Sequence, residues 1–184
     1  MQSLKPVRLC IVILACLVLI TAPALAAEQA DAGNPLVAVD VWSNLDRGRE
    51  DAEKAVFSLV DRQKYRFADI GQLVANNKAH FGEAGPLLSR DKAALIAFGR
   101  KYGYDYILAA HFRQDMQYVY HKITPYYIAR LTVRIRILDV RQNRILYADS
   151  FTISDYDVFY LREDLVKRVV DQAVLRIENI PCLN

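Results

Sequence analysis

The residues best suited to do chemistry in this chain lie around two histidines. His111, Asp115 and His121 form an H-x3-D-x5-H string, and imidazole and carboxylate groups are common ligands of zinc. On a β-strand these three side chains would share one face. Ten residues of strand span about 33 Å, however, which is too far for both histidines to bind one ion unless the segment folds back. We therefore expect ordinary surface histidines, no metal site and no cofactor.

Other catalytic patterns are weaker still. No serine lies in a G-x-S-x-G setting, and Cys182 has no neighbouring base in the sequence. Gly82 and Gly85 are not followed by the Lys-Ser/Thr pair of a phosphate-binding loop. Acidic pairs such as Glu50-Asp51 stand near expected helix starts, where negative charge offsets the helix dipole. The sequence predicts no catalytic residue and no enzyme. A hydrolase is a weaker alternative, and it would need a histidine that converges with acids in one pocket.

A mixture of aromatic and arginine side chains gives the best indication of function. Tyrosine and arginine are enriched in protein interfaces because they combine a large contact area with polar tips. We predict that these residues form a surface for a protein partner. The alternative is a sheet edge whose tyrosines cover core residues. The predicted surface consists of Phe112, Arg113, Tyr118, Tyr120, Tyr126, Tyr127, Arg130, Arg134 and Arg136.

The N-terminus has the features of a secretory signal peptide. Lys5 and Arg8 precede an apolar run from Cys10 to Ala22, and Ala24-Leu25-Ala26 fits an A-x-A cleavage site. Cleavage near Ala26 would make the protein periplasmic or secreted. The alternative is a retained N-terminal anchor, and membrane association is expected only in that case.

The domain organisation follows from this cleavage site. We expect residues 1–26 to be the signal peptide, residues 27–34 a flexible leader and residues 35–184 a single α/β domain. Cleavage would remove two cations and no anions, so the formal net charge would fall from +3 to +1. A near-neutral exported protein is not expected to bind nucleic acid, although single strands of nucleic acid can bind to tyrosines and arginines.

Cys182 would be the last cysteine left after cleavage, so it can pair only between chains or with a small thiol. A homo-oligomer therefore stays open.

The clearest structural pattern is a pair of strands between Tyr126 and Ser154. From Leu131 to Ile137, aliphatic residues alternate with threonine and arginine, which is typical of a strand with one buried and one wet face. The polar break Asp139–Asn143 and the β-rich run Ile145–Ile153 then predict an antiparallel hairpin. We place this hairpin at the centre of a sheet.

Apolar stripes at helical spacing predict three helices around this sheet. They are expected over Asp46–Asp61, over Arg90–Tyr102 with Ser89 as N-cap and Gly103 in the left-handed position, and over Leu161–Ile180. Further strands are expected over Pro35–Trp42, over Tyr65–Ile70 and from Tyr104, and a turn over Asp155–Tyr160. The segment Arg113–Thr124 can extend a strand, form a bulge or form a protruding hairpin arm.

This order of elements predicts an α/β fold. We expect a two- or three-layer sandwich, with a mixed sheet of about five strands and three helices. The arginines on the wet face of the hairpin indicate that the helices leave that side of the sheet uncovered.

Gly71–Pro86 is expected to be a long surface loop. If it acts as a lid, the protein is a small-ligand-binding domain, which is the main alternative to a protein partner.

Two segments resemble a group of bacterial envelope domains. Ala97–Phe112 (AFGRKYGYDYILAAHF) is similar to the helix-Gly-x-Asp-Tyr-Ile-Leu step of that group, and Val133–Phe151 (VRIRILDVRQNRILYADSF) resembles its hairpin. The group includes the periplasmic domain of the curli secretion channel, the lipoprotein activator of penicillin-binding proteins and the N-terminal domain of the Tol-Pal propeller protein. Members often carry a lipid-anchor cysteine and a Thr-Gly turn, which this chain lacks. The resemblance implies a non-enzymatic envelope protein that acts through contacts with another envelope protein.

Overall fold

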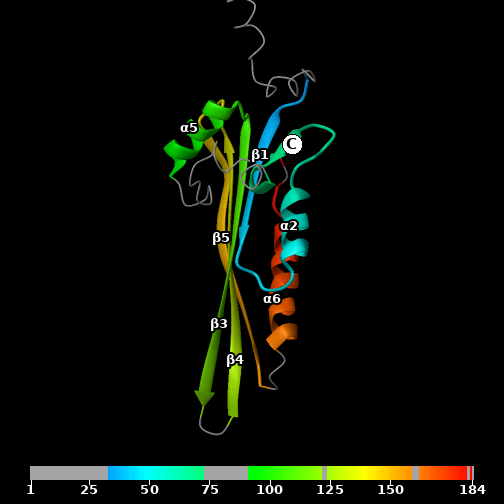
Figure 1. Cartoon of the computed structure of the whole chain (residues 1–184), viewed down its shortest axis with the longest axis vertical. Helices are drawn as coiled ribbons and strands as arrows, with labels where there is room; N and C mark the ends of the chain where they lie inside the picture. The colour runs from blue at the N-terminus through cyan, green and yellow to red at the C-terminus, as the bar shows by residue number, and fades with distance from the viewer. Residues whose placement is uncertain (1–32, 73–90, 122–123, 159–161, 182, 184) are drawn as a thin grey trace, which may run out of the picture. The chain divides into compact units, whose positions relative to one another are not determined.

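The computed structural model describes residues 33–72, 91–121, 124–158, 162–181 and 183 (Figure 1). Pro35–Asn184 form one compact unit, and Met1–Asn34 form another, of which only the last two residues are described. The predicted signal peptide, most of the leader, residues 73–86 of the predicted loop and Cys182 lie outside the described residues. No helix in the described ranges combines the length with the hydropathy that crossing a bilayer requires.

A five-stranded mixed sheet with the strand order β2-β1-β3-β4-β5 organises the compact unit. β1 pairs in parallel with β2 and β3, whereas β3, β4 and β5 pair antiparallel. Three helices of seven residues or more accompany the sheet in the described residues, so the predicted α/β fold is confirmed. The elements are β1 (Leu36–Ser43), α2 (Arg49–Phe57), β2 (Arg66–Asp69), α5 (Lys92–Tyr102), β3 (Tyr106–His121), β4 (Thr124–Asp139), β5 (Arg144–Asp157) and α6 (Arg162–Ile177).

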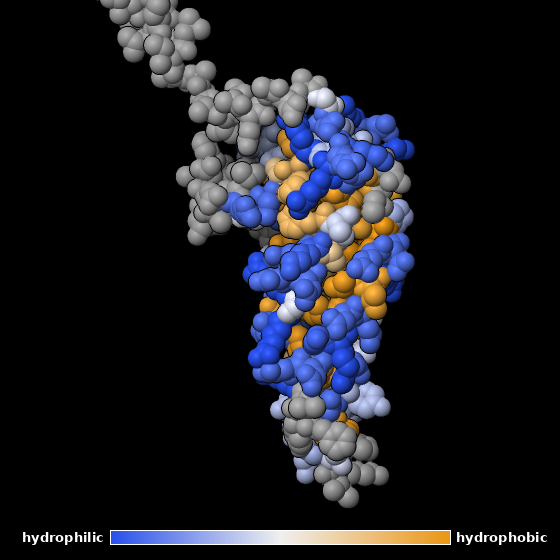
Figure 2. Space-filling model, turned by 90° about the vertical axis from the view of Figure 1, so that its right-hand side faces the viewer, coloured by the Kyte–Doolittle hydropathy of each residue, from blue (hydrophilic) through white to orange (hydrophobic). Residues whose placement is uncertain are grey.

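The larger core lies between one face of the sheet and the helices α2 and α6, which pack side by side (Figure 1). On β4, Leu131, Val133, Ile135 and Ile137 are at most 2% exposed, as the alternation in the sequence predicts. Each buried aliphatic side chain stabilises the fold by about 1.5–3 kcal/mol relative to an exposed one. Figure 2 views the side on which α2 and α6 lie, and there hydrophilic residues cover much of the surface with hydrophobic surface between them.

A second, smaller core lies on the opposite face, where α5 covers one end of the sheet (Figure 1). α5 begins after Asp91, whose Oδ1 accepts a hydrogen bond from the Ala94 amide at 2.7 Å. It ends at Gly103, whose φ of 74° is the predicted left-handed conformation. The predicted N-cap Ser89 is therefore wrong, because Asp91 performs that role and the helix starts at Lys92.

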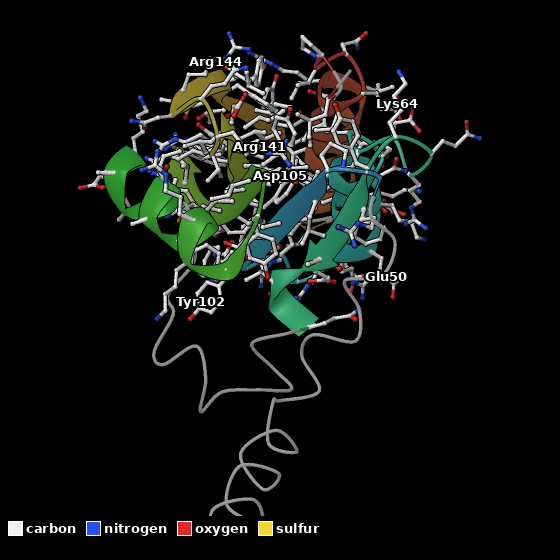
Figure 3. All side chains as sticks on the ribbon, turned by 90° about the horizontal axis from the view of Figure 1, so that it is seen from above. Glu50, Lys64, Tyr102, Asp105, Arg141 and Arg144 are labelled. Carbon is white, nitrogen blue, oxygen red and sulfur yellow. The ribbon has the colours of Figure 1, made fainter. Side chains whose placement is uncertain are left out.

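Asp105 joins three segments at the end of the sheet that α5 covers. Its Oδ2 accepts a hydrogen bond from the Leu36 amide at 2.9 Å, and its carbonyl accepts one from the Val140 amide at 2.9 Å. Its Oδ1 forms an ion pair with Arg141, and Figure 3 shows the two side chains close to each other. One residue in the helix-to-strand step thus fixes the start of β1 and the turn between β4 and β5.

One predicted position and two predicted boundaries of elements are wrong. The hairpin of β4 and β5 is not the centre of the sheet, because β3 is the middle strand and β5 is an edge strand. Residues 155–157 are not a turn, since β5 continues to Asp157 in register with Tyr127. α2 starts later than predicted because Gly48 before it has a φ of 71°, outside the helical region.

The segment after Phe112 extends the strand into a hairpin arm. β1 stops at the pair Ser43 and Phe112, while β3 and β4 stay in continuous register from Tyr106–Asp139 to His121–Thr124. Beyond Phe112, β4 is therefore the one strand of the described residues that pairs with β3. Of the three alternatives left open by the sequence, the structure contains the extended strand and its arm, without a bulge between β3 and β4.

Candidate protein-binding surface

The predicted arginines share one face of the sheet. Arg130, Arg134 and Arg136 point away from the larger core along β4, and the register of β3 places Arg113 on the same face. In the described residues, α2 and α6 lie on the other face and α5 covers only the end near Ala109. We call the rest the open face. Its residues on the last three strands include Arg113, Asp115, Arg130, Thr132, Arg134, Arg136, Ser150, Thr152 and Ser154.

A polar pocket lies in the middle of the open face. It has a volume of about 290 Å³ and we call it the arginine pocket; its lining residues are His111, Arg113, Asp115, Arg130, Thr132 and Arg134. Three guanidinium groups therefore surround one carboxylate. Asp115 forms its ion pair with Arg113, at 3.4 Å between Oδ2 and Nε. The described residues place no carboxylate in ion-pair contact with Arg130 or Arg134. The pocket thus presents an excess of positive charge to the solvent.

His111 lines the arginine pocket and contacts Trp42 of β1. The Trp42 ring meets the imidazole edge to face, with 4.1 Å between ring centroids and 84° between planes. The Nε2 atom is buried without a hydrogen-bond partner in the described residues. Burial, and then the positive charges of Arg134 and Arg113, lower the pKa of His111 below its usual value. A lowered pKa favours the neutral form of the imidazole at physiological pH.

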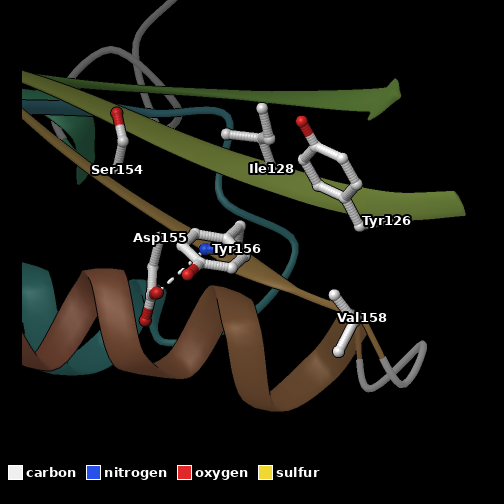
Figure 4. Close-up of a pocket in the computed structure, with 6 residues that line it drawn as sticks. All are labelled: Tyr126, Ile128, Ser154, Asp155, Tyr156 and Val158. Carbon is white, nitrogen blue, oxygen red and sulfur yellow. Dashed lines mark hydrogen bonds between the residues drawn. The ribbon is translucent and has the colours of Figure 1, made fainter. Parts of the chain in front are cut away.

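An apolar pocket of about 300 Å³ adjoins the arginine pocket along β4 and β5. We call it the tyrosine pocket, and Figure 4 shows its lining residues: Tyr126, Ile128, Ser154, Asp155, Tyr156 and Val158. The Tyr156 side chain is 65% exposed, and its ring lies 6.1 Å from that of Tyr126. Ser154 is the register partner of Arg130, so the two pockets meet at this cross-strand pair.

The structure divides the nine predicted surface residues between the two faces. Arg113, Tyr126, Arg130, Arg134 and Arg136 lie on the open face. Phe112, Tyr118, Tyr120 and Tyr127 lie on the other face, because they alternate with the first set along the strands.

Two of the predicted residues, Phe112 and Tyr127, belong to the larger core or pack against it. Phe112 is 0% exposed and belongs to the larger core, so its assignment to a contact surface is wrong. Tyr127 is half-buried and packs against the same core, with its ring 5.0 Å from that of Tyr118. The placement of Tyr127 therefore agrees with the alternative prediction, in which tyrosines at a sheet edge cover core residues.

Several residues that line the two pockets were missed from the sequence, among them Thr132, Ile128 and Tyr156. On the same face of β4, Thr132 lies between Arg130 and Arg134 and Ile128 lies just before Arg130, and Tyr156 joins them from β5. The sequence does contain a signal that places Tyr156 on this face, because Thr152, Ser154 and Tyr156 continue the alternation of β5. A turn was predicted over those last residues, which removed Tyr156 from the strand.

The sequence predicts neither a metal site nor a catalytic site, and the positions of His111 and Asp115 on the open face bear on both predictions. The described residues contain no group of three or more His, Cys, Asp or Glu side chains that can hold a metal ion. His111 and Asp115 line the same pocket, but they are four residues apart on a straight strand, about 13 Å along its axis. Because Asp115 pairs with Arg113, it does not orient the imidazole as an acid–base pair requires.

Comparison with known proteins finds similarity only at the level of solved structures. No family model and no curated protein sequence matches this chain. Lipoprotein GNA1162 from Neisseria meningitidis is similar with a TM-score of 0.48 at 14% identity, over 80% of this chain and 99% of that one. A minor lipoprotein from Acinetobacter baumannii has a TM-score of 0.42 at 14% identity, over 78% and 87% of the two chains. The LpoB C-terminal domain from Escherichia coli has a TM-score of 0.36 at 15% identity, over 66% and 84%.

The similarity of this chain to these structures is partial. Bacterial lipoproteins are among them, while the resemblance to the curli secretion channel and to the Tol-Pal propeller protein stays a prediction. With identities below 25% and TM-scores below 0.5, no partner and no activity are transferred from these proteins to this one.

Proposed function

We propose that this chain is a non-enzymatic accessory protein of the cell envelope that binds another envelope protein through its open face. One observation carries the proposal: Arg130 and Arg134 are exposed on a sheet face that the described helices leave uncovered, and no described carboxylate pairs with them. Uncompensated arginines beside aromatic side chains are typical of protein interfaces. A periplasmic or secreted location is supported by the signal-peptide features of residues 1–26.

The proposal is tested by removing the two arginines. Arg130→Ser/Arg134→Ser is expected to fold normally, because both side chains are exposed and serine is tolerated on a strand facing water. Tagged protein carrying this change should capture less of its partner from envelope extracts than the wild type. The matched control is Arg47→Ser/Arg49→Ser, which removes two arginines on the side of α2 and α6. An unchanged capture profile for the first variant would overturn the proposal.

A small-ligand-binding domain is the second candidate. The arginine and tyrosine pockets have volumes of about 290 and 300 Å³, at the lower limit of the roughly 300–1,000 Å³ of typical ligand sites. A ligand that binds the native state raises the melting temperature by mass action, so a thermal-shift screen of small anionic and aromatic compounds separates the two candidates. A melting temperature that rises with ligand concentration would favour the second.

A further inference from the structure

The arginine pocket and the tyrosine pocket are neighbours on the open face, and we call the two together the track. Arg130 lines the first pocket, its register partner Ser154 lines the second, and Ile128 is the next outward-facing residue on β4. The track runs from Ile128 to Arg134, six residues of strand or about 20 Å. This length matches about six or seven residues of an extended peptide.

The two ends of the track differ in chemistry. The arginine pocket has three guanidinium groups and a neutral imidazole, and its one carboxylate, Asp115, lies opposite Arg130 and is already paired with Arg113. The end at Tyr156 is apolar and contains a large aromatic side chain that is 65% exposed. A single small anion would use only the first end. A segment with acidic side chains at one end and a large apolar side chain at the other complements both.

We propose that the partner contributes an extended acidic segment, whose carboxylates bind Arg130 and Arg134 and whose aromatic or aliphatic side chain occupies the tyrosine pocket. This inference rests on the proposed function and names the chemistry of the partner. Guanidinium groups bind carboxylates through paired, charge-assisted hydrogen bonds, and adjacent apolar pockets are where large side chains anchor a partner.

The spacing of the pockets specifies a probe. In an extended peptide, residues an even number apart share one face, so an apolar residue opposite Ile128 places acids two and six positions away opposite Arg130 and Arg134. The probe is therefore a fluorescent heptapeptide, Trp-Ser-Glu-Ser-Thr-Ser-Glu, together with its reversed sequence because the direction of binding is open. Lysine in place of both glutamates, and serine in place of tryptophan, give the two control peptides.

Fluorescence anisotropy with the mature protein tests the proposal. Arg130→Ser/Arg134→Ser should weaken binding of one of the two probes by about tenfold, which corresponds to about 1.4 kcal/mol. Tyr156→Ser should weaken it separately, and the effect should vanish for the peptide without tryptophan. Tyr120→Ser is the matched control because Tyr120 is also strongly exposed, at 71%, but lies on the other face. Arg47→Ser/Arg49→Ser serves the same purpose for the arginines.

A second measurement uses His111 as a reporter inside the pocket. Carboxylates that neutralise Arg134 should raise the pKa of His111, and NMR titration of the imidazole with and without the probe measures this, with His111→Gln assigning the signal. The groups facing the imidazole are Trp42, Arg113 and Arg134. The pKa should not move with the lysine peptide.

The outcomes separate this inference from the proposed function. If neither probe binds, or if the control variants weaken binding equally, the inference is wrong, even where capture from envelope extracts depends on Arg130 and Arg134. Binding to anionic phospholipid vesicles that needs the same two arginines, without peptide binding, would also overturn it in favour of a lipid surface. Peptide binding without any arginine-dependent capture would instead contradict the proposed function.

Discussion

The side chain of Asn44 pairs with the main chain of Gln114 in the manner of a neighbouring strand. The Gln114 amide donates to Oδ1 of Asn44 at 2.6 Å, and Nδ2 of Asn44 donates to the Gln114 carbonyl at 3.0 Å. The Asn44 amide also donates to the Phe112 carbonyl at 3.2 Å. β1 has ended one residue earlier, so these bonds satisfy the edge of β3 where the arm begins.

We predict that Asn44→Ala lowers the free energy of unfolding by about 1–2 kcal/mol, since it removes two hydrogen bonds at about 0.5–1.5 kcal/mol each. Urea denaturation measures the loss, and amide hydrogen exchange should speed up at Gln114. Asn179→Ala is the control, because among the described residues its side chain bonds only to the Leu175 carbonyl at the end of α6. Unchanged exchange at Gln114 in Asn44→Ala would show that the side chain does not protect the edge.

Phe112→Ala should be one of the more damaging substitutions in the chain. The side chain is fully buried in the larger core, and truncation of a buried phenylalanine costs about 3–5 kcal/mol. Tyr120→Ser, at an exposed position of the same strand, should change stability by less than about 0.5 kcal/mol. Similar denaturation midpoints for the two variants would contradict the placement of Phe112 in the core.

Gly99→Ala should destabilise the protein although alanine favours helix. A Cβ at this position would lie 2.6 Å from Cγ2 of Val140, so either α5 or the Val140 side chain must shift. Overpacking costs about 1–3 kcal/mol, against a gain of about 1 kcal/mol in helix propensity. In a double-mutant cycle, Val140→Ala should make Gly99→Ala less costly. Additive effects would exclude the contact.

Arg168 connects α6 to the end of β5 and makes stability depend on pH. Its Nε lies 2.7 Å from Oδ2 of Asp155. Burial, the largest single effect, would raise the pKa of Asp155, but the hydrogen bond from the Tyr156 amide and the contacts with Arg168 outweigh it and lower that pKa. A lowered carboxyl pKa in the folded state adds stability above the ordinary carboxyl pKa of about 4, and this stability is lost as the pH falls through the folded value.

Asp155→Asn should therefore have a lower melting temperature than the wild type at pH 7, and the difference should shrink as the pH falls below about 4. Thermal melts by circular dichroism between pH 3 and 7 measure it. Asp171→Asn on the exposed side of α6 is the control and should show no such convergence. A difference that grows in acid would reverse the sign of the proposed linkage.

The strands and their buried faces could be predicted because a period of two fixes which side chains point inward. The alternation at Leu131, Val133, Ile135 and Ile137 therefore located the larger core. The order of the strands could not be predicted, because alternation shows that one face is buried and does not show which strand is the neighbour. The edge position of β5 depends instead on contacts between segments far apart in the sequence.

The candidate surface was predicted in part for the same reason. Arg130, Arg134 and Arg136 lie together because they share the parity of one strand. Phe112 and Arg113 are adjacent on a strand, so they must face opposite sides, but this argument requires that Arg113–Thr124 be extended. The sequence left that segment open, and its polar and aromatic composition fits a bulge or loop as well as a strand. The division of the nine residues between two faces followed only from the register of β3 and β4.

Site-specific photo-crosslinking in intact cells shows which face of the protein meets its partner. A photoreactive amino acid at Ser150, which is exposed on the open face opposite Arg134, is compared with one at Gln172, which is exposed on α6. If the open face binds the partner, a defined adduct with another envelope protein forms at Ser150 and not at Gln172. Mass spectrometry identifies this adduct, and it should be lost in Arg130→Ser/Arg134→Ser. Adducts at Gln172 alone, or no adduct at Ser150, would contradict binding through the open face.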